Sequence, residues 1–168
     1  MAEPRVGILM GSANDMDVMR ECTDMLKKLG IAFEVEVASA HRTPDRTARY
    51  AESARSRGLR VLVAGAGAAA HLAGVVAAHT TLPVLGVPID SSPLKGLDAL
   101  LSTAQMPGGV PVAAMAIGKA GARNAAIFAA QVLATADPEV ALRLHTLRDE
   151  MREAVDKQSA QLKAEFPG

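Results

Sequence analysis

The sequence has very few aromatic residues and a single cysteine. Tryptophan is absent, and one tyrosine with three phenylalanines makes up an aromatic content of 2%. Proteins that bind single-stranded nucleic acid usually stack the bases on aromatic side chains, so the composition argues against that class. Because Cys22 is the only cysteine, an internal disulfide and a cysteine-rich metal site are excluded.

Net charge and long apolar runs are also missing. The 18 basic and 18 acidic residues give a net charge of zero, so no overall field favours DNA or a membrane surface. No stretch approaches the roughly 18 uninterrupted apolar residues of a membrane-spanning helix. The apolar run near the N-terminus is too short and too late for a secretory signal. We therefore expect a cytoplasmic protein without nucleic-acid or membrane partners.

What the sequence does have is enough apolar material for one core. Its 168 residues are 49% hydrophobic, which suits a single domain over residues 1–168. Short apolar runs alternate with segments of helical periodicity, as in βαβ proteins. The predicted strands are 5–10, 33–38, 59–64, 83–87 and 112–117, and the predicted helices are 14–29, 45–57, 68–79, 95–104 and 120–135. This order predicts an α/β fold, a flavodoxin-like three-layer αβα sandwich with a five-stranded parallel sheet.

A long helix is predicted over residues 137–165. Asp137 is a suitable N-cap, and Pro138 suits the first helical position. Apolar residues then recur every three or four positions, at Val140, Leu144, Leu147, Met151 and Val155. This stripe needs a surface to cover it. A neighbouring subunit can supply that surface, or the helix can fold back onto its own sheet, and the pattern leaves both open.

The loops that follow the strands are the first places to look for a site, because open α/β sheets bind ligands beyond the carboxyl ends of their strands. The first loop reads GSAND over residues 11–15. Its backbone N–H groups can hold a phosphate at a helix N-terminus, and Asp15 can accept from ribose hydroxyls. The alternative is that Asn14 or Asp15 merely caps the helix.

The second loop reads SAHRTP over residues 39–44. His41 titrates near neutral pH and can transfer a proton, whereas Arg42 can pair with a phosphate or a carboxylate. A histidine beside an arginine at a strand end is a better functional candidate than one on a helix face. His79 and His145 lie within helical patterns, and we interpret both as surface or packing residues. Cys22 falls on an apolar helix face and is predicted to be core.

The third loop reads GAGAAAH over residues 65–71. It contains the G-x-G-x-x-A pattern of dinucleotide-binding folds, but that pattern belongs after the first strand of a longer domain. Small residues instead leave a flat floor on which a planar ring can lie against the backbone. In this interpretation His71 lines the pocket.

Together these loops resemble the N5-carboxyaminoimidazole ribonucleotide mutase family. The similarity is carried by the segments GSANDMD, SAHRTP, AGAGAAAHLAG, PVLGVP, QMPGGVPV and AIGKAGARNAA, over residues 6–136. The resemblance implies a flavodoxin-like fold assembled into a homo-octamer, with C-terminal helices that reach neighbouring subunits.

The resemblance also implies a reaction of de novo purine synthesis. The family moves CO2 from the exocyclic nitrogen of a ribonucleotide to C4 of its imidazole, without ATP, metal or biotin. A related branch carboxylates aminoimidazole ribonucleotide directly with CO2, and it has G-R-S-N where this sequence has the segment ending in Ala70-His71-Leu72. The alternatives are therefore a direct carboxylase or a non-catalytic flavin- or nucleotide-binding module.

Site residues follow from the same resemblance. His41 is the expected acid and base, and neither a metal ligand nor a cofactor is expected. The residues expected to bind the ribonucleotide substrate are Gly11, Ser12, Asp15, Ser39, Ala40, Arg42, Gly67, His71 and Leu72. Two positions depart from the family pattern: Asn14 replaces a serine, and Ala73 replaces a proline. We expect altered geometry in the first loop and a looser start to the third helix, which leaves open a paralogue with another substrate.

Overall fold

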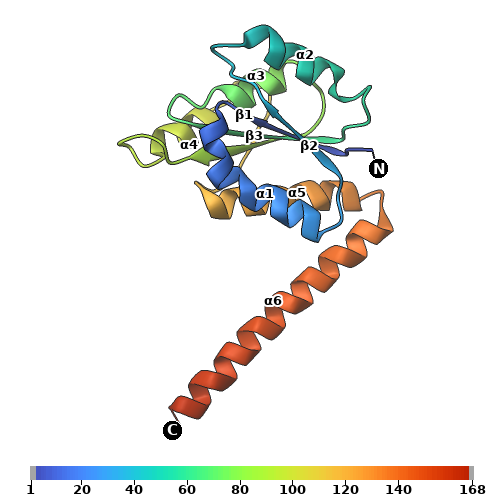
Figure 1. Ribbon diagram of the computed structural model, residues 1–168, viewed down its shortest axis with the longest axis vertical. Helices are drawn as coiled ribbons and strands as arrows, with labels where there is room; N and C mark the ends of the chain where they lie inside the picture. Colours follow the sequence, from blue (N-terminus) through green and yellow to red (C-terminus); the bar gives the residue numbers. More distant parts are fainter. Residues whose placement is uncertain (1–2, 167–168) are drawn as a thin grey trace.

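A parallel sheet lies at the centre of the structure, a computed structural model that describes residues 3–166 (Figure 1). Its strands are β1 (Val6–Met10), β2 (Phe33–Val37), β3 (Val61–Gly67), β4 (Val84–Ile89) and β5 (Ala113–Ala114), in the spatial order β2-β1-β3-β4-β5. The helices are α1 (Met16–Lys28), α2 (Pro44–Ala54), α3 (Leu72–Ala78), α4 (Leu97–Ala104), α5 (Lys119–Ala134) and α6 (Pro138–Glu165), with a short 3-10 turn, η1 (Ala13–Asp15). The predicted fold class is confirmed.

Helices cover both faces of the sheet and divide the core into two parts. Figure 1 shows α1 and α5 on one face, and α2 and α3 on the other. The side chains of Val61 and Val63 enter the cluster under α1 and α5, whereas that of Leu62 enters the cluster under α2 and α3. A strand buried on both faces needs such a continuous apolar run, because successive side chains point to opposite faces.

The sheet register brings the first three loops to one edge. Met10, the last residue of β1, pairs with Val37 of β2 on one side and with Gly65 of β3 on the other. The chain crosses β1 when it passes from β2 to β3, so β1 marks the point at which the strand order reverses. In parallel sheets this point opens a crevice at the carboxyl ends.

Two predicted helix starts were wrong because the backbone is left-handed at the residues predicted to begin the helices, Ala68 and Lys95. β3 continues to Gly67 instead of ending at residue 64, and Ala68 has a φ of 48°. Consequently α3 begins at Leu72 rather than at residue 68. Lys95 and Gly96 have φ values of 51° and 83°, which delay α4 to residue 97. Left-handed backbone cannot continue into a right-handed helix.

The fifth strand is much shorter than the predicted 112–117. Only two residues pair with β4, through Leu85↔Ala113 and Gly86↔Ala114. Further along β4, the carbonyl of Pro88 accepts from the N–H of Gly118. Proline has no N–H to offer on that same side, so a regular ladder cannot continue past it.

Helix α6 begins as predicted. The Asp137 carboxylate accepts from the backbone N–H groups of Glu139 and Val140, and Pro138 occupies the first helical position. Arg5 pairs with Asp137 at 2.5 Å, and its hydrogen bond lowers the pKa of that carboxyl. The start of α6 is thereby fixed to the chain just before β1.

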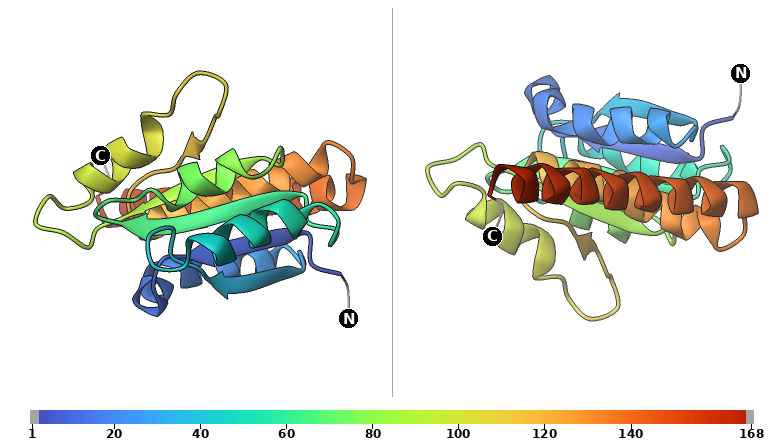
Figure 2. Two further views of the ribbon diagram at one scale, coloured as in Figure 1. Left: turned by 90° about the horizontal axis from the view of Figure 1, so that it is seen from above. Right: turned by 90° about the horizontal axis from the view of Figure 1, so that it is seen from below.

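The apolar stripe of α6 is divided between two environments. Val140 and Leu147 are buried within the core cluster that contains α5. Beyond them the helix projects from the body on the side of α1 and α5 (Figures 1 and 2), and Met151 and Val155 are 50% and 63% exposed. The first half of the stripe therefore packs on its own chain. No helix in residues 3–166 is both long and apolar enough to cross a membrane.

The packing of α5 yields a test of the fold. A Cβ on Gly121 would lie 1.6 Å from the carbonyl oxygen of Ala116, so the backbone must move if alanine replaces it. We expect Gly121→Ala to lower the free energy of unfolding by about 1–3 kcal/mol. Gly108→Ala is the matched control, because a Cβ there meets nothing within 4 Å. Equal melting temperatures for the two variants would contradict this packing.

Candidate active site

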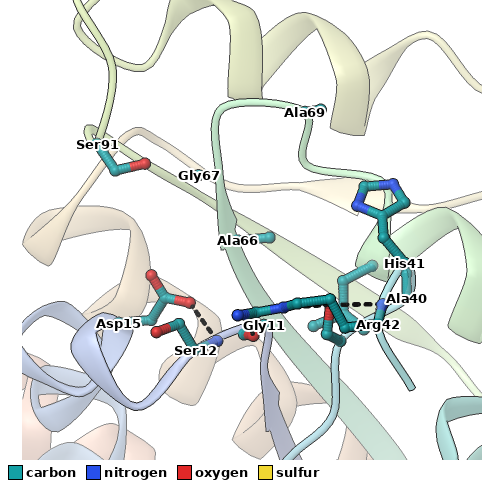
Figure 3. Close-up of a pocket in the computed structure, with 12 residues that line it drawn as sticks. Gly11, Ser12, Asp15, Ala40, His41, Arg42, Ala66, Gly67, Ala69 and Ser91 are labelled. Carbon is teal, nitrogen blue, oxygen red and sulfur yellow. Dashed lines mark hydrogen bonds between the residues drawn. The ribbon is translucent and has the colours of Figure 1, made fainter. Parts of the chain in front are cut away.

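A cavity of about 310 Å³ lies at the carboxyl edge of the sheet (Figure 3). Its walls come from the loops after β1, β2, β3 and β4. The lining residues are Gly11, Ser12, Asp15, Ser39, Ala40, His41, Arg42, Ala66, Gly67, Ala69, Leu72 and Ser91. All of the predicted site residues except His71 are in this set.

The first loop is both a helix cap and a wall of the cavity. The Ser12 hydroxyl accepts from the N–H of Asn14, and the Asp15 carboxylate accepts from the N–H of Ser12 at 3.0 Å. This reciprocal capping box holds η1 in place. Asn14 is exposed and contributes only its backbone here, and it does not line the cavity. The departure at this position therefore leaves the cavity wall unchanged.

Asp15 occupies an environment that does not fully stabilise its charge. Burial raises the pKa of this carboxyl, and the Ser12 N–H together with the positive charge of Arg42 offsets that rise only in part. The ionised carboxylate thus lacks some of the hydrogen bonding that water would provide. A ligand hydroxyl that donates to Asp15 would supply it.

The second loop is braced internally and tied to the first. The N–H of Ser39 donates to the Thr43 hydroxyl at 2.9 Å, and the N–H of Thr43 donates to the Ser39 carbonyl. Arg42 extends its guanidinium across the cavity (Figure 3), where Nη2 donates to the carbonyl of Gly11 at 2.8 Å. Proline at the first position of α2 ends the loop. Arg42 is therefore held in place before any ligand binds.

His41 and His71 form a hydrogen-bonded pair. Nε2 of His41 lies 2.8 Å from Nδ1 of His71, and the rings meet edge to face with centroids 5.0 Å apart. One nitrogen must carry the proton and the other must accept it. His71 thus belongs to the site through His41 rather than through the cavity wall. Both rings are exposed at the mouth of the cavity.

Three lining residues were missed by sequence reasoning. Ala66 and Ala69 lie in or beside β3, and the floor of small residues was expected there without naming them. Ser91 follows β4 and was not considered, although the rule about the carboxyl ends of strands applies equally to that loop. Its hydroxyl is close to Gly67, since a Cβ on this glycine would lie 1.8 Å from the Ser91 Oγ.

The remaining chemistry-bearing residues lie outside the site. Cys22 is buried, and burial raises the pKa of its thiol to about 12, so the prediction that it is core is confirmed. His79 contacts Glu52 at the surface, and His145 is exposed on α6. Within residues 3–166, no group of three or more His, Cys, Asp and Glu side chains has a metal-binding arrangement. Ala73 is buried at the start of a regular α3, and the looser start expected there stays a prediction.

The comparison with known proteins agrees with the motifs that frame the cavity. The sequence matches the family described as AIR carboxylase over residues 5–154. The chain belongs to this family. It is 52% identical over 160 residues to the N5-carboxyaminoimidazole ribonucleotide mutase of Bacillus subtilis, with 95% of this chain and 99% of that protein covered. It is 55% identical over 150 residues to the mutase of Pseudomonas aeruginosa, with 89% and 92% covered.

A solved structure shows the same architecture. The PurE protein of Treponema denticola superposes with a TM-score of 0.86 at 26% identity, and the match covers 95% of this chain and 99% of that one. The predicted resemblance to the mutase family and the flavodoxin-like sandwich are therefore confirmed.

Proposed function

We propose that this protein isomerises N5-carboxyaminoimidazole ribonucleotide to 4-carboxy-5-aminoimidazole ribonucleotide in de novo purine synthesis. The observation that carries the proposal is that the loop of Ser12 and the loop of His41 and Arg42, in a mutase-like sequence, line one cavity. The proposed compartment is the cytoplasm, where such biosynthesis takes place and where the lone thiol of Cys22 stays reduced.

The polar groups suit a ribonucleotide phosphate and ribose. The Ser12 hydroxyl accepts from Asn14 and keeps its own hydrogen for a phosphate oxygen. Arg42, which lines the same cavity as Ser12, adds a positive charge and further N–H donors for the phosphate. The Asp15 carboxylate can accept from a ribose hydroxyl, which offsets its burial.

The proposed chemistry needs one group that both gives and takes a proton. Loss of CO2 from the substrate breaks the N–C bond, and the exocyclic nitrogen takes a proton from the protonated form of His41. C4 of the imidazole then attacks the trapped CO2. Neutral His41 removes the C4 hydrogen to restore aromaticity, and it returns to its starting state. The hydrogen bond to His71 holds the ring of His41 in place during this exchange.

The cavity of one chain is open to water at the end where the proton transfer takes place. His41 and Arg42 are both exposed, whereas trapping of CO2 requires that water be kept out. We infer that bound substrate and neighbouring subunits close the site, in a homo-octamer whose α6 helices cross to adjacent copies. The exposed second half of the α6 stripe supports this assembly.

The direct carboxylase and the flavin module are the competing functions. The segment Ala70-His71-Leu72 favours the mutase. His71 is the hydrogen-bond partner of His41, and the G-R-S-N sequence of the carboxylase branch has no histidine to take that place. We expect purified protein to convert N5-carboxyaminoimidazole ribonucleotide in EDTA without nucleotide. In ¹³C-bicarbonate buffer, the mutase product keeps an unlabelled carboxylate. A labelled product would indicate the direct carboxylase, and a yellow inactive protein would indicate the flavin module.

The role of His41 is tested by replacing it with asparagine. His41→Asn keeps the approximate size and some hydrogen bonding but removes proton transfer, so kcat should fall at least ~100-fold. Substrate binding, measured by calorimetry, should persist. His79→Gln is the control, because His79 lies at the surface just after the C-terminal end of α3. Near-normal turnover by His41→Asn would rule out its proposed role.

The assembly is tested on the part of α6 beyond Leu147, where Met151 and Val155 belong to neither core cluster. The double variant Met151→Glu, Val155→Glu leaves Val140 and Leu147 in place, so the subunit should still fold. Each apolar side chain contributes about 1.5–3 kcal/mol when fully buried, and buried glutamates would reverse that gain. Light scattering should show a smaller particle than wild type. Lys157→Glu on the polar side of α6 should keep the wild-type mass, and an unchanged mass for the double variant would contradict the proposal.

A further inference from the structure

We propose that Ser91 binds one ribose hydroxyl of the nucleotide, next to the hydroxyl that Asp15 binds. The inference rests on the proposed function, since it names the part of that substrate which reaches the loop after β4. Ser91 follows β4 by two residues and lines the same cavity as Asp15 and Gly67. None of the sequence motifs considered above includes it.

Figure 3 shows how Ser91 lies in the cavity. Its hydroxyl points inward past Gly67, from the same end of the cavity as Asp15. His41 lies at the opposite end, beyond Ala66. A ligand that places its reacting ring at His41 and one sugar hydroxyl at Asp15 therefore brings the neighbouring hydroxyl toward Ser91.

Gly67 makes room for this hydroxyl. A Cβ at position 67 would lie 1.8 Å from the Ser91 Oγ and 3.1 Å from the carbonyl oxygen of Ile89. The serine thus occupies space that any larger residue at 67 would fill, and its oxygen is brought against the cavity floor. Gly67 and Ser91 therefore shape the same part of the cavity wall.

The Ser91 hydroxyl differs from the other serine hydroxyls around the cavity. Those of Ser12 and Ser39 each accept a backbone N–H and so stabilise their loops, as does that of Ser92, which lies outside the cavity lining. In the chain from residue 3 to residue 166, no hydrogen bond engages the Ser91 hydroxyl. A hydroxyl that stabilises nothing in its loop and faces a cavity is suited to a ligand.

The chemistry favours a sugar hydroxyl over a charged group. Arg42 is the only lysine or arginine among the described residues that line the cavity, and it contacts Gly11 on another wall. A phosphate or carboxylate at Ser91 would therefore lack a cationic partner. An ionised Asp15 can only accept hydrogen bonds, whereas a serine hydroxyl can donate and accept. The two neighbouring hydroxyls of a ribose match this pair.

The test measures binding of aminoimidazole ribonucleotide and of its 2′-deoxy and 3′-deoxy analogues by calorimetry. Ser91→Ala should weaken binding of the ribonucleotide about 2- to 12-fold, the net effect of one neutral hydrogen bond. For one of the two deoxy analogues, wild type and Ser91→Ala should bind equally. Ser92→Ala is the control, because it removes a neighbouring loop hydroxyl that does not line the cavity. Its affinities should match those of wild type.

Several outcomes would overturn the inference. If Ser91→Ala binds the ribonucleotide as wild type does, or loses the same factor for all three ligands, Ser91 makes no specific ribose contact. The proposed function is judged separately by isomerisation with wild-type protein. If wild type isomerises the substrate and Ser91→Ala binds the ribonucleotide as wild type does, only this inference is rejected. If wild type does not isomerise the substrate but the binding measurements follow the predicted pattern, only the mutase function is rejected. Wild type that binds no ribonucleotide rejects both.

Discussion

The parallel pairing of β1 with both β2 and β3 is the constraint on which the site depends. It brings the ends of three strands, distant in sequence, to one edge within a single register, with Met10 opposite Val37 and Gly65. The hydrogen bond from Arg42 to the carbonyl of Gly11 then joins two of the loops. Because β1 is buried on both faces, a one-residue slip in register would exchange its side chains between the two core clusters. The packing of the strands therefore sets which loops meet at the cavity.

Small residues at the end of β3 contribute by leaving space. At Gly67 the lack of a Cβ lets the Ser91 hydroxyl approach the backbone, and Ala66 and Ala69 keep the floor shallow. The same device operates in the core, where α5 approaches the backbone of Ala116 through Gly121. Close backbone contact takes the place of large side chains in a chain with so few aromatics.

Hydrogen bonds within the chain hold the polar groups of the cavity in place, but they do not satisfy the full hydrogen-bonding capacity of these groups. Asp15 is partly desolvated and accepts only part of the hydrogen bonding that its charge requires. His41 is oriented by His71 yet remains exposed. The groups of the cavity are thus arranged within the single chain, while part of the cavity, like the outer half of α6, stays exposed. Preorganised groups of this kind need little rearrangement during the reaction.

Local sequence determined much of this protein. Apolar runs fixed the order of strands and helices, Asp137-Pro138 fixed the start of α6, and the loop motifs identified the family and most of the cavity wall. Tertiary structure decided what depends on through-space contact. The His41–His71 pair joins residues 30 positions apart, Ser91 reaches Gly67 from another strand, and Pro88 stops β5 from the neighbouring strand. The stripe of α6 was visible in sequence, but its division between α5 and solvent was not. Periodicity reports which face of a helix is apolar, whereas only the folded chain shows how far a surface extends to meet it.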